Sequence, residues 1–308
     1  MMTGNQTNVK EFILLGFPGS WYLQISLFML FLFMYILTLL GNITIIAVVG
    51  THRRLHSPMY YFLCNLSFLD ILFTTTYIPQ TLANFVSQSK TISFPSCLLQ
   101  MYFVFSLGCI EYLLLAVMAY DRYLAICHPL RYSSTMNSTF SSQLVFGSWV
   151  SGFLSFSVLA FLISRLTFCG PKIINHFFCD VDSWIVLSCT DTHLIEMVYI
   201  AIAYIVILGS CAVTLVSYIY IISTILRIPS GQGWQKAFST CSAHFTVVVI
   251  LYTCSIFVYV MPSKQNSLNM NKIVTLLNNV TTPLLNPFIY TLRNKEIKEI
   301  LREAFRTI

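Results

Sequence analysis

Seven long apolar stretches follow one another along the chain, separated by polar or proline-bearing connections. A helix needs about 20 apolar residues to cross the hydrocarbon core of a bilayer, and each stretch meets that length. Because lipid offers no partner for backbone N–H and C=O groups, such stretches must fold as helices. They cover about 23–49, 58–85, 97–126, 141–163, 195–226, 236–261 and 272–291. We therefore predict an all-α membrane protein built as a bundle of seven transmembrane helices.

The charge content supports a membrane location. Only 9% of the 308 residues are charged and 56% are hydrophobic, whereas a soluble domain carries about 25% charged residues. No linker-like segment divides the chain, so we expect one domain over 1–308. Its parts are an extracellular tail over 1–22, a long extracellular loop over 164–194 and a cytoplasmic tail over 293–308, which has the spacing of a short amphipathic helix.

The positions of Lys and Arg predict the orientation. With the N-terminus outside, eleven of them fall on the cytoplasmic side and six on the outside, as the positive-inside rule requires. The net charge of +6 is therefore better explained by topology than by nucleic-acid binding. This orientation makes Asn5 of Asn5-Gln6-Thr7 available for glycosylation. It also places Cys97, Cys169, Cys179 and Cys189 outside, where disulfides form, and four cysteines allow three pairings.

Two carboxylic acids lie in the middle of apolar stretches. Asp70 is in the second and Glu111 in the third, and intramembrane acids are usually paired, protonated or bound to a cation. Together with Asn42 and Asn286 they predict a Na⁺ or proton site. The alternative is a protonated pair that serves packing alone.

The third stretch ends in Met118–Pro129, which contains the adjacent charges Asp121 and Arg122. Such a pair is either a boundary anchor whose arginine reaches the headgroups or a functional site. Helical spacing places Arg122 on the same face as Glu111 and Val104. The seventh stretch contains Pro283 and Pro287, and such prolines kink membrane helices.

These motifs resemble those of the olfactory receptors, within the rhodopsin-like G-protein-coupled receptors. The resemblance rests on Leu55–Leu63, Met118–Cys127, Ser217-Tyr218, Lys236–His244 and Pro283–Tyr290, in the family's order. A short connection around Pro262 to Met270 is similar to that of the tetrapod-type (class II) group. Leu251-Tyr252-Thr253-Cys254 departs from the family's usual run, which puts the packing of the sixth helix in question.

The resemblance implies disulfides from Cys97 to Cys179 and from Cys169 to Cys189. It also implies an odorant cavity below the long outer loop. The expected wall is apolar, with a few hydroxyls and one amide, as suits a small volatile. The wall residues are Val104, Phe105, Gly108, Cys109, Ile202, Val206, Tyr252, Ser255, Ile256, Tyr259 and Asn279. Val104 is not an acid and Val280 is not a lysine, which argues against a cationic ligand or bound retinal.

The resemblance further implies a switch at the cytoplasmic end. Asp121 would hold Arg122 at rest, and activation would release it toward Tyr218 and Tyr290. The residues of this switch are Asp121, Arg122, Tyr123, Tyr218, His244 and Tyr290. The implied partner is the olfactory stimulatory G protein, with cyclic AMP as the product signal, and the implied location is the plasma membrane of olfactory neuron cilia.

Other functions remain as alternatives. A non-olfactory receptor for another small lipophilic ligand fits the same pattern. A transporter would be expected to show inverted repeats, and an enzyme a catalytic motif, neither of which the sequence carries. We expect no cofactor other than the possible Na⁺ at Asp70 and Glu111. His176-x-x-Cys179-Asp180 resembles a motif proposed to bind copper, but oxidation of Cys179 would remove one of the copper ligands.

Overall fold

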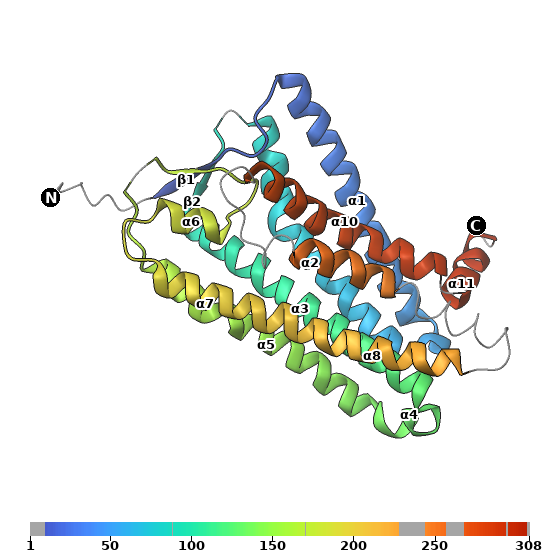
Figure 1. The fold of residues 1–308 in the computed structure, drawn as a ribbon. Coiled ribbons are helices and arrows are strands. Elements are labelled where there is room, and N and C mark those ends of the chain that lie inside the picture. Colours follow the sequence, from blue (N-terminus) through green and yellow to red (C-terminus); the bar gives the residue numbers. More distant parts are fainter. Residues whose placement is uncertain are drawn as a thin grey trace.

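The computed structural model describes residues 10–87, 89–169, 171–227, 244–256, 268–293 and 295–306. Figure 1 shows a bundle of long helices with a small sheet at one end. The long helices are α1 (Trp21–Thr51), α2 (Pro58–Val86), α3 (Phe94–Cys127), α5 (Ser138–Ser164), α7 (His193–Ala203), α8 (Gly209–Leu226) and α10 (Leu268–Arg293). A π-helical turn, η2 (Tyr204–Leu208), joins α7 and α8 into one continuous span.

These helices match the predicted apolar stretches to within a few residues at each end. Among the described residues, five spans are long and apolar enough to cross a membrane. The helix His244–Ser255 covers the described part of the predicted sixth stretch. The seventh stretch is α10, which contains Pro283 and Pro287 as expected.

Helix α3 lies at the centre of the bundle. It packs against α2, α5 and α8, whereas α1 contacts α2 and α10 at the periphery. Of the most apolar part of α3, 72% is buried inside the protein, against 17% for α1. Side chains on α3 therefore face protein on most sides, and this central helix carries more of the predicted functional residues than any other helix.

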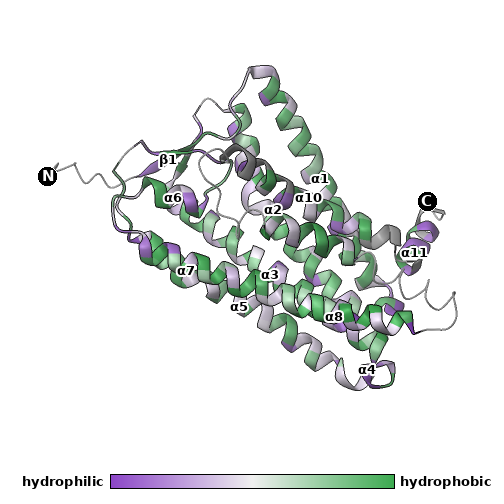
Figure 2. Cartoon of the chain, viewed as in Figure 1, coloured by the Kyte–Doolittle hydropathy of each residue, from purple (hydrophilic) through white to green (hydrophobic). Residues whose placement is uncertain are grey.

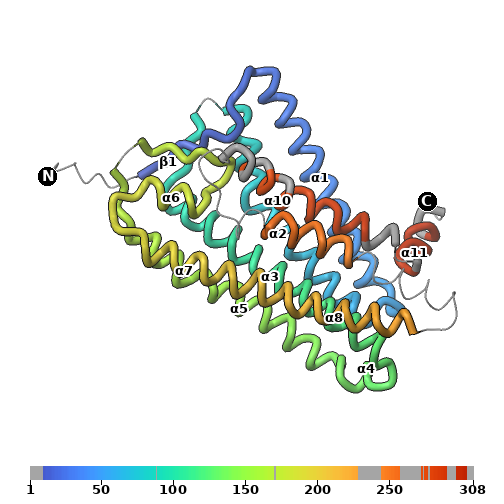
Figure 3. Tube along the Cα trace, viewed as in Figure 1, coloured from blue at the N-terminus to red at the C-terminus, as the bar shows by residue number. Residues whose placement is uncertain are grey.

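The sheet end of the molecule is built from segments far apart in the sequence. Strand β1 (Glu11–Leu14) lies between β2 (Thr91–Ser93), to which it is antiparallel, and β3 (Ile173–Ile174), to which it is parallel. The predicted extracellular tail thus includes a strand, and the predicted loop 164–194 contains β3 and α6 (Val181–Leu187). Figure 3 follows the blue N-terminal segment as it passes beside the loop that carries α6.

An aromatic cluster fills the space between this sheet and α6. Phe12 and Trp184 are fully buried, with ring centroids 5.2 Å apart. Phe94 and Phe168 pack against Trp184 at 5.3 and 5.5 Å. Because four rings from four segments share one contact site, the sheet end has a hydrophobic core of its own.

The opposite end carries short helices. These are η1 (Arg53–Leu55), α4 (Pro129–Thr135) and α11 (Lys295–Arg306). The last confirms the amphipathic helix predicted in the C-terminal tail, since Ile297 is buried on the bundle side. The Tyr60 hydroxyl donates to Glu296 Oε2 at 2.7 Å and ties α11 to α2. Figure 2 shows hydrophobic residues along the long helices and hydrophilic ones gathered at α4 and α11.

Candidate functional site

A cavity lies among the helices below the sheet end. Residues of α2, α3, α5, α7, η2 and α10 form its wall. They are Phe73, Val104, Phe105, Gly108, Cys109, Glu111, Tyr112, Phe156, Tyr199, Ile202, Ala203, Val206, Ile207, Asn278 and Asn279.

Most of the predicted wall residues lie on this cavity. Val104, Phe105, Gly108, Cys109, Ile202, Val206 and Asn279 all line it. Tyr252, Ser255 and Ile256, on the helix His244–Ser255 and its end, do not line it. Ser255 is fully buried, and its hydroxyl is hydrogen-bonded to the Tyr112 hydroxyl, so it supports a wall residue from behind. Tyr259 lies outside the described residues.

One end of the cavity is polar. The Tyr77 hydroxyl donates to the Asn279 carbonyl at 2.9 Å, and Asn278 Nδ2 donates to Ser255 Oγ at 3.5 Å. Glu111 lies at the same end, although the sequence assigned it only to an ion site. An acid does therefore reach the cavity, at Glu111 and not at the position of Val104.

The predicted ion-site residues are buried beside one another. Asn286 Nδ2 donates to Asp70 Oδ2 at 2.9 Å, and Asn42 Nδ2 donates to the Pro283 carbonyl at 3.2 Å. Glu111 and Asp70 are close enough to act on each other electrostatically. Each of Asn42, Asp70, Glu111 and Asn286 keeps one buried oxygen without a hydrogen-bond partner among the described residues. A set of unpaired oxygen acceptors suits a hard cation such as Na⁺ or a bound water.

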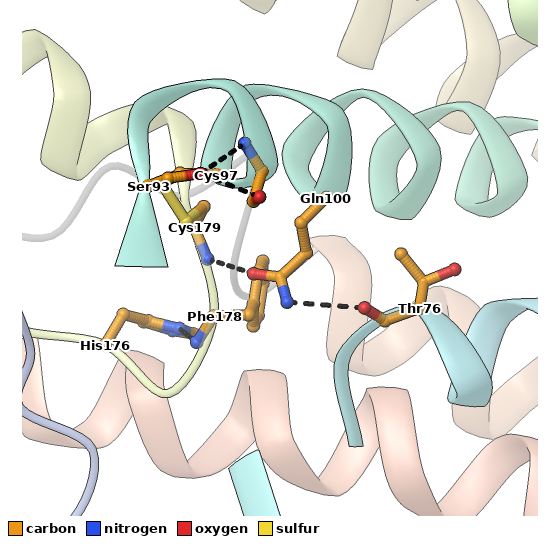
Figure 4. The surroundings of a disulfide bond; sticks show 8 residues. Thr76, Ser93, Cys97, Gln100, His176, Phe178 and Cys179 are labelled. Carbon is orange, nitrogen blue, oxygen red and sulfur yellow. Dashed lines mark hydrogen bonds between the residues drawn. A yellow bond between two sulfur atoms is a disulfide. The ribbon is translucent and has the colours of Figure 1, made fainter. Parts of the chain in front are cut away.

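Both disulfides pair as the resemblance implied. Cys97 of α3 is joined to Cys179, and Cys169 is joined to Cys189 within the segment 164–194. Figure 4 shows the surroundings of the first. There Gln100 accepts a hydrogen bond from the Cys179 backbone N–H at 2.9 Å and donates to the Thr76 carbonyl at 3.3 Å. Because the Cys179 sulfur is bonded to Cys97, it is not a thiolate that could bind copper with His176.

We call the segment 164–194 the roof of the cavity. His176 is buried in this roof between two phenylalanines. Its ring centroid is 4.4 Å from those of both Phe177 and Phe178, and its Nδ1 accepts the Phe178 N–H at 3.5 Å. Burial, with a smaller contribution from Lys272, lowers the pKa of His176 to about 3. The imidazole is therefore neutral, in agreement with its role as an acceptor.

Lys272 fastens the roof to α10. Its Nζ donates to the Gly16 carbonyl and to Asn175 Oδ1, the latter at 3.3 Å, and lies 5.2 Å from the centroid of the Phe17 ring. Gly16 adopts a φ of 61°, a left-handed conformation that glycine reaches without steric cost. The turn after β1 thus places a carbonyl where the lysine can bind it.

At the opposite end, Asp121 and Arg122 form an ion pair. Arg122 Nε donates to Asp121 Oδ2 at 2.9 Å, and Nη2 binds the same oxygen. The Tyr132 hydroxyl of α4 donates to Asp121 Oδ1 at 2.8 Å, so both carboxylate oxygens are engaged. Burial and the neighbouring Asp121 raise the pKa of Tyr132, which keeps its hydroxyl protonated as a donor.

The remaining predicted switch residues surround this pair. The Tyr218 hydroxyl is hydrogen-bonded to His244 Nδ1 at 2.6 Å and so joins α8 to the helix His244–Ser255. Tyr123 is hydrogen-bonded to His128 at 2.9 Å. Tyr290 lies in α10, and its side chain is outside the described residues. One end of the molecule thus holds a mainly apolar cavity, and the other holds a buried ion pair with interhelical hydrogen bonds.

A family model described as olfactory receptor matches residues 31–307 of this chain. The chain belongs to the olfactory receptor family. Members of this family are seven-transmembrane G-protein-coupled receptors and not enzymes. The chain is therefore a multi-pass membrane protein whose sixth and seventh spans include the helix His244–Ser255 and α10.

Several olfactory receptors are similar to the chain over almost its whole length. Olfactory receptor 6F1 of Homo sapiens is 60% identical over 306 residues, which are 99% of either chain. Olfactory receptor 287 of Rattus norvegicus is 59% identical over 302 residues, 98% of this chain and 97% of the relative. Olfactory receptor 6B9 of Mus musculus is 48% identical over 300 residues, 97% and 95% of the two chains.

Sequence reasoning missed part of the wall of this olfactory receptor's cavity. Ala203 and Ile207 follow the predicted Ile202 and Val206 by one residue, and all four line the cavity. An α-helical period does not place consecutive residues on one face, but the π-helical turn η2 widens the helix at this point. Phe73 and Phe156 come from α2 and α5, helices that the resemblance did not assign to the site. Tyr112, Tyr199 and Asn278 belong to none of the sequence motifs, so they were not predicted as wall residues.

Proposed function

We propose that this chain is an odorant receptor of the plasma membrane, in olfactory neuron cilia. It binds small, mainly apolar volatile molecules in the cavity below the sheet end and activates a stimulatory heterotrimeric G protein, which raises cyclic AMP. Membership of the olfactory receptor family and the mainly apolar cavity support this proposal. Family membership carries most weight for olfaction, and the cavity supports the binding of a small apolar ligand, because its wall includes predicted residues from α3, α7, η2 and α10.

Signalling requires the two ends of the molecule to be linked. The arrangement of α3 supports such a link, since one helix contributes Val104 and Gly108 to the cavity and Asp121 and Arg122 to the ion pair. A ligand that binds the active arrangement more tightly would shift the balance away from the ion-paired state. Release of Arg122 would then open a groove in which a G-protein helix binds.

The experiment that tests this proposal removes the guanidinium. In cells that express Arg122→Ala, we expect volatile-driven cyclic AMP to fall to the level of cells without receptor, at equal surface expression. Arg165→Ala is the matched control, because Arg165 is exposed at the other end of the molecule and lies over the Phe161 ring. Full cyclic AMP responses in Arg122→Ala would contradict the assigned role.

We further propose that Asp70 and Glu111, with Asn42 and Asn286, hold Na⁺ or share a proton. Their unpaired oxygens support this assignment, and a neutral pair that serves packing alone is the alternative. Purified receptor should be more heat-stable in sodium chloride than in choline chloride, and Asp70→Asn should lose that difference. Equal stability in both salts would rule out a Na⁺ site, and Asp70 and Glu111 would then share a proton or serve packing alone.

The second candidate function is a non-olfactory receptor for another small lipophilic ligand. The cavity favours neither function, because an apolar wall accepts lipophilic molecules from any source. A cyclic AMP screen of the expressed receptor against chemically diverse volatiles separates the two.

A further inference from the structure

The two prolines of α10 each leave one backbone carbonyl without its helical donor. In an α-helix the N–H of each residue donates to the carbonyl four residues before it, and proline has no N–H. Pro283 therefore frees the Asn279 carbonyl, and Pro287 frees the Pro283 carbonyl. Inside a membrane such groups need a partner from the protein, because lipid offers none.

A side chain from a different helix binds each of these two carbonyls. The Tyr77 hydroxyl of α2 donates to the Asn279 carbonyl at 2.9 Å. Asn42 Nδ2 of α1 donates to the Pro283 carbonyl at 3.2 Å. The freed carbonyls and the donors correspond one to one, so the Tyr77 hydroxyl takes the place of the backbone donor that Pro283 lacks.

The position of Tyr77 connects this hydrogen bond to the cavity. Tyr77 is fully buried, and it is not itself part of the cavity wall. Its ring centroid lies 5.6 Å from that of Phe73, which lines the cavity. Asn279, whose carbonyl it binds, and the adjacent Asn278 line the cavity from α10. Tyr77 therefore lies behind two parts of the wall, one on α2 and one on α10.

Tyr77 also contacts the roof. Its ring centroid lies 6.2 Å from that of Phe177 and 6.0 Å from that of Phe178. Thr81, one turn further along α2, donates to the Phe177 carbonyl at 3.2 Å. The wall, the roof and α10 thus meet at one tyrosine. Removal of its hydroxyl alone would keep the ring contacts, which separates the hydrogen bond from the packing.

We propose that Tyr77 is a positioning residue of the ligand site, whose hydroxyl replaces the donor that Pro283 lacks and so fixes Asn278 and Asn279 on the cavity wall. This inference rests on the proposed function, since it assigns a role to a residue behind the same cavity. The hydroxyl is needed only because Pro283 has no N–H, so its removal should matter only while proline occupies position 283. A tyrosine that served packing alone would show no such dependence, because its ring contacts do not involve that N–H.

The test is a double-mutant cycle between Tyr77→Phe and Pro283→Ala. Tyr77→Phe removes the hydroxyl and keeps the ring. Pro283→Ala returns a backbone donor to the Asn279 carbonyl. Pro287→Ala returns a donor to the Pro283 carbonyl instead, so it serves as the matched control background. Each effect of Tyr77→Phe is measured within one background, which removes the effect of the proline substitution itself.

The first readout is amide hydrogen exchange in α10 of the purified full-length receptor, because it measures local opening of a helix without any ligand. Tyr77→Phe should speed this exchange at least about tenfold in the wild-type and Pro287→Ala backgrounds, which corresponds to one hydrogen bond of about 1.4 kcal/mol. In the Pro283→Ala background it should change the rate by about threefold or less. Tyr35→Phe removes a hydroxyl that joins α1 to Thr75 of α2 at 3.0 Å, and it should leave the exchange of α10 unchanged.

The second readout is the cyclic AMP concentration–response to the most potent volatile of a chemically diverse panel. Tyr77→Phe should raise the concentration for half of the maximal response about tenfold and leave the maximal response unchanged, since it loosens the wall and not the ion pair at Arg122. The shift should be absent in the Pro283→Ala background. A general loss of folded receptor would instead lower the maximal response.

An equal effect of Tyr77→Phe on exchange in the wild-type and Pro283→Ala backgrounds, or no effect in the wild type, would overturn the inference. Normal potency in Tyr77→Phe would also overturn it, because the hydroxyl would then not act on the cavity. If Tyr77→Phe failed to fold, its surface expression should recover in the Pro283→Ala background alone, and equal loss in every background would contradict the assignment. The expected exchange pattern without any cyclic AMP response would contradict the proposed coupling and leave the positioning role standing.

Discussion

At the scale of single residues, Gly108 leaves open space on the wall of the cavity. It lies in the interior of α3, where glycine costs about 0.5–1 kcal/mol relative to alanine. A Cβ at this position would meet no atom within 4 Å, so close packing does not explain the glycine. Since Gly108 lines the cavity, its missing side chain is space that a ligand can use.

We predict that Gly108→Val weakens the response to the largest odorants and spares the response to smaller ones. Volatiles that fill the cavity should lose at least about tenfold in potency, because forcing extra carbon atoms into a filled site costs about 1–3 kcal/mol. Smaller homologues should keep their potency. The measurement is the cyclic AMP concentration–response across a homologous series.

Gly147→Val is the control for this change. A Cβ at Gly147 would likewise meet no atom within 4 Å, but this glycine is exposed on α5. The substitution should leave the chain-length optimum unchanged. An unchanged optimum in Gly108→Val as well would mean that the ligand does not reach this part of α3.

At the scale of elements, the long helices were predictable from the sequence and the sheet end was not. A span of about 20 apolar residues admits one solution in lipid, so α1, α2, α3, α5 and α10 appear close to their predicted bounds. Strands β1 and β3 have only four and two residues. Their pairing depends on contacts between distant segments, which no local pattern reports.

The residues of the candidate site also differ in whether the sequence could predict them. Val104 and Gly108 on α3 were predicted as wall residues from the family resemblance, and both line the cavity. Ala203 and Ile207 were missed because the π-helical turn η2 breaks the helical spacing. The position of Ser255 behind Tyr112 follows from a side-chain hydrogen bond, which a sequence does not specify.

We predict that the roof becomes less stable in acid because of His176. Burial lowers its pKa in the folded protein to about 3 from the ordinary value of 6.5. Below about pH 6.5 the unfolded chain binds a proton at His176 that the folded chain does not. The free energy of unfolding is therefore unaffected by His176 above pH 6.5 and falls as the pH decreases below it. The slope reaches at most about 1.4 kcal/mol per pH unit.

Melting temperatures of purified receptor between pH 4.5 and 7.5 check this prediction. The wild type should lose more stability toward pH 4.5 than His176→Gln, which has no group that titrates there. Burial raises the pKa of Asp180 to about 8, an effect of opposite sign, and the difference between the two proteins removes it. If the melting temperatures of the two proteins fell equally with decreasing pH, protonation of His176 would not destabilise the fold, which would contradict the prediction.

At the scale of the whole molecule, the distribution of charge predicts which end faces the cell exterior. The sheet end carries both disulfides, which form in oxidising compartments. The opposite end carries α11 with its lysines and arginines. The two features agree on one orientation, with the N-terminus outside.

We predict that Asn5 is glycosylated, although it lies outside the described residues. Expressed receptor should run faster on a denaturing gel after treatment with an N-glycosidase, and Asn5→Gln should run at that faster position without treatment. Asn137→Gln should change nothing, because Asn137 lies at the opposite end of the molecule, where its side chain caps α5. A glycosidase shift that persists in Asn5→Gln would contradict this topology.

The central position of β1 also has a consequence for biosynthesis. Strand β1 leaves the ribosome before its partner β3, which follows it by about 160 residues. At about 5–20 residues per second, the ribosome needs on the order of ten seconds or more to deliver that partner. During this time β1 has an unpaired edge that is open to chaperones or to other chains. The small sheet is thus completed only after β3 has been made, later than the pairing of β1 with β2.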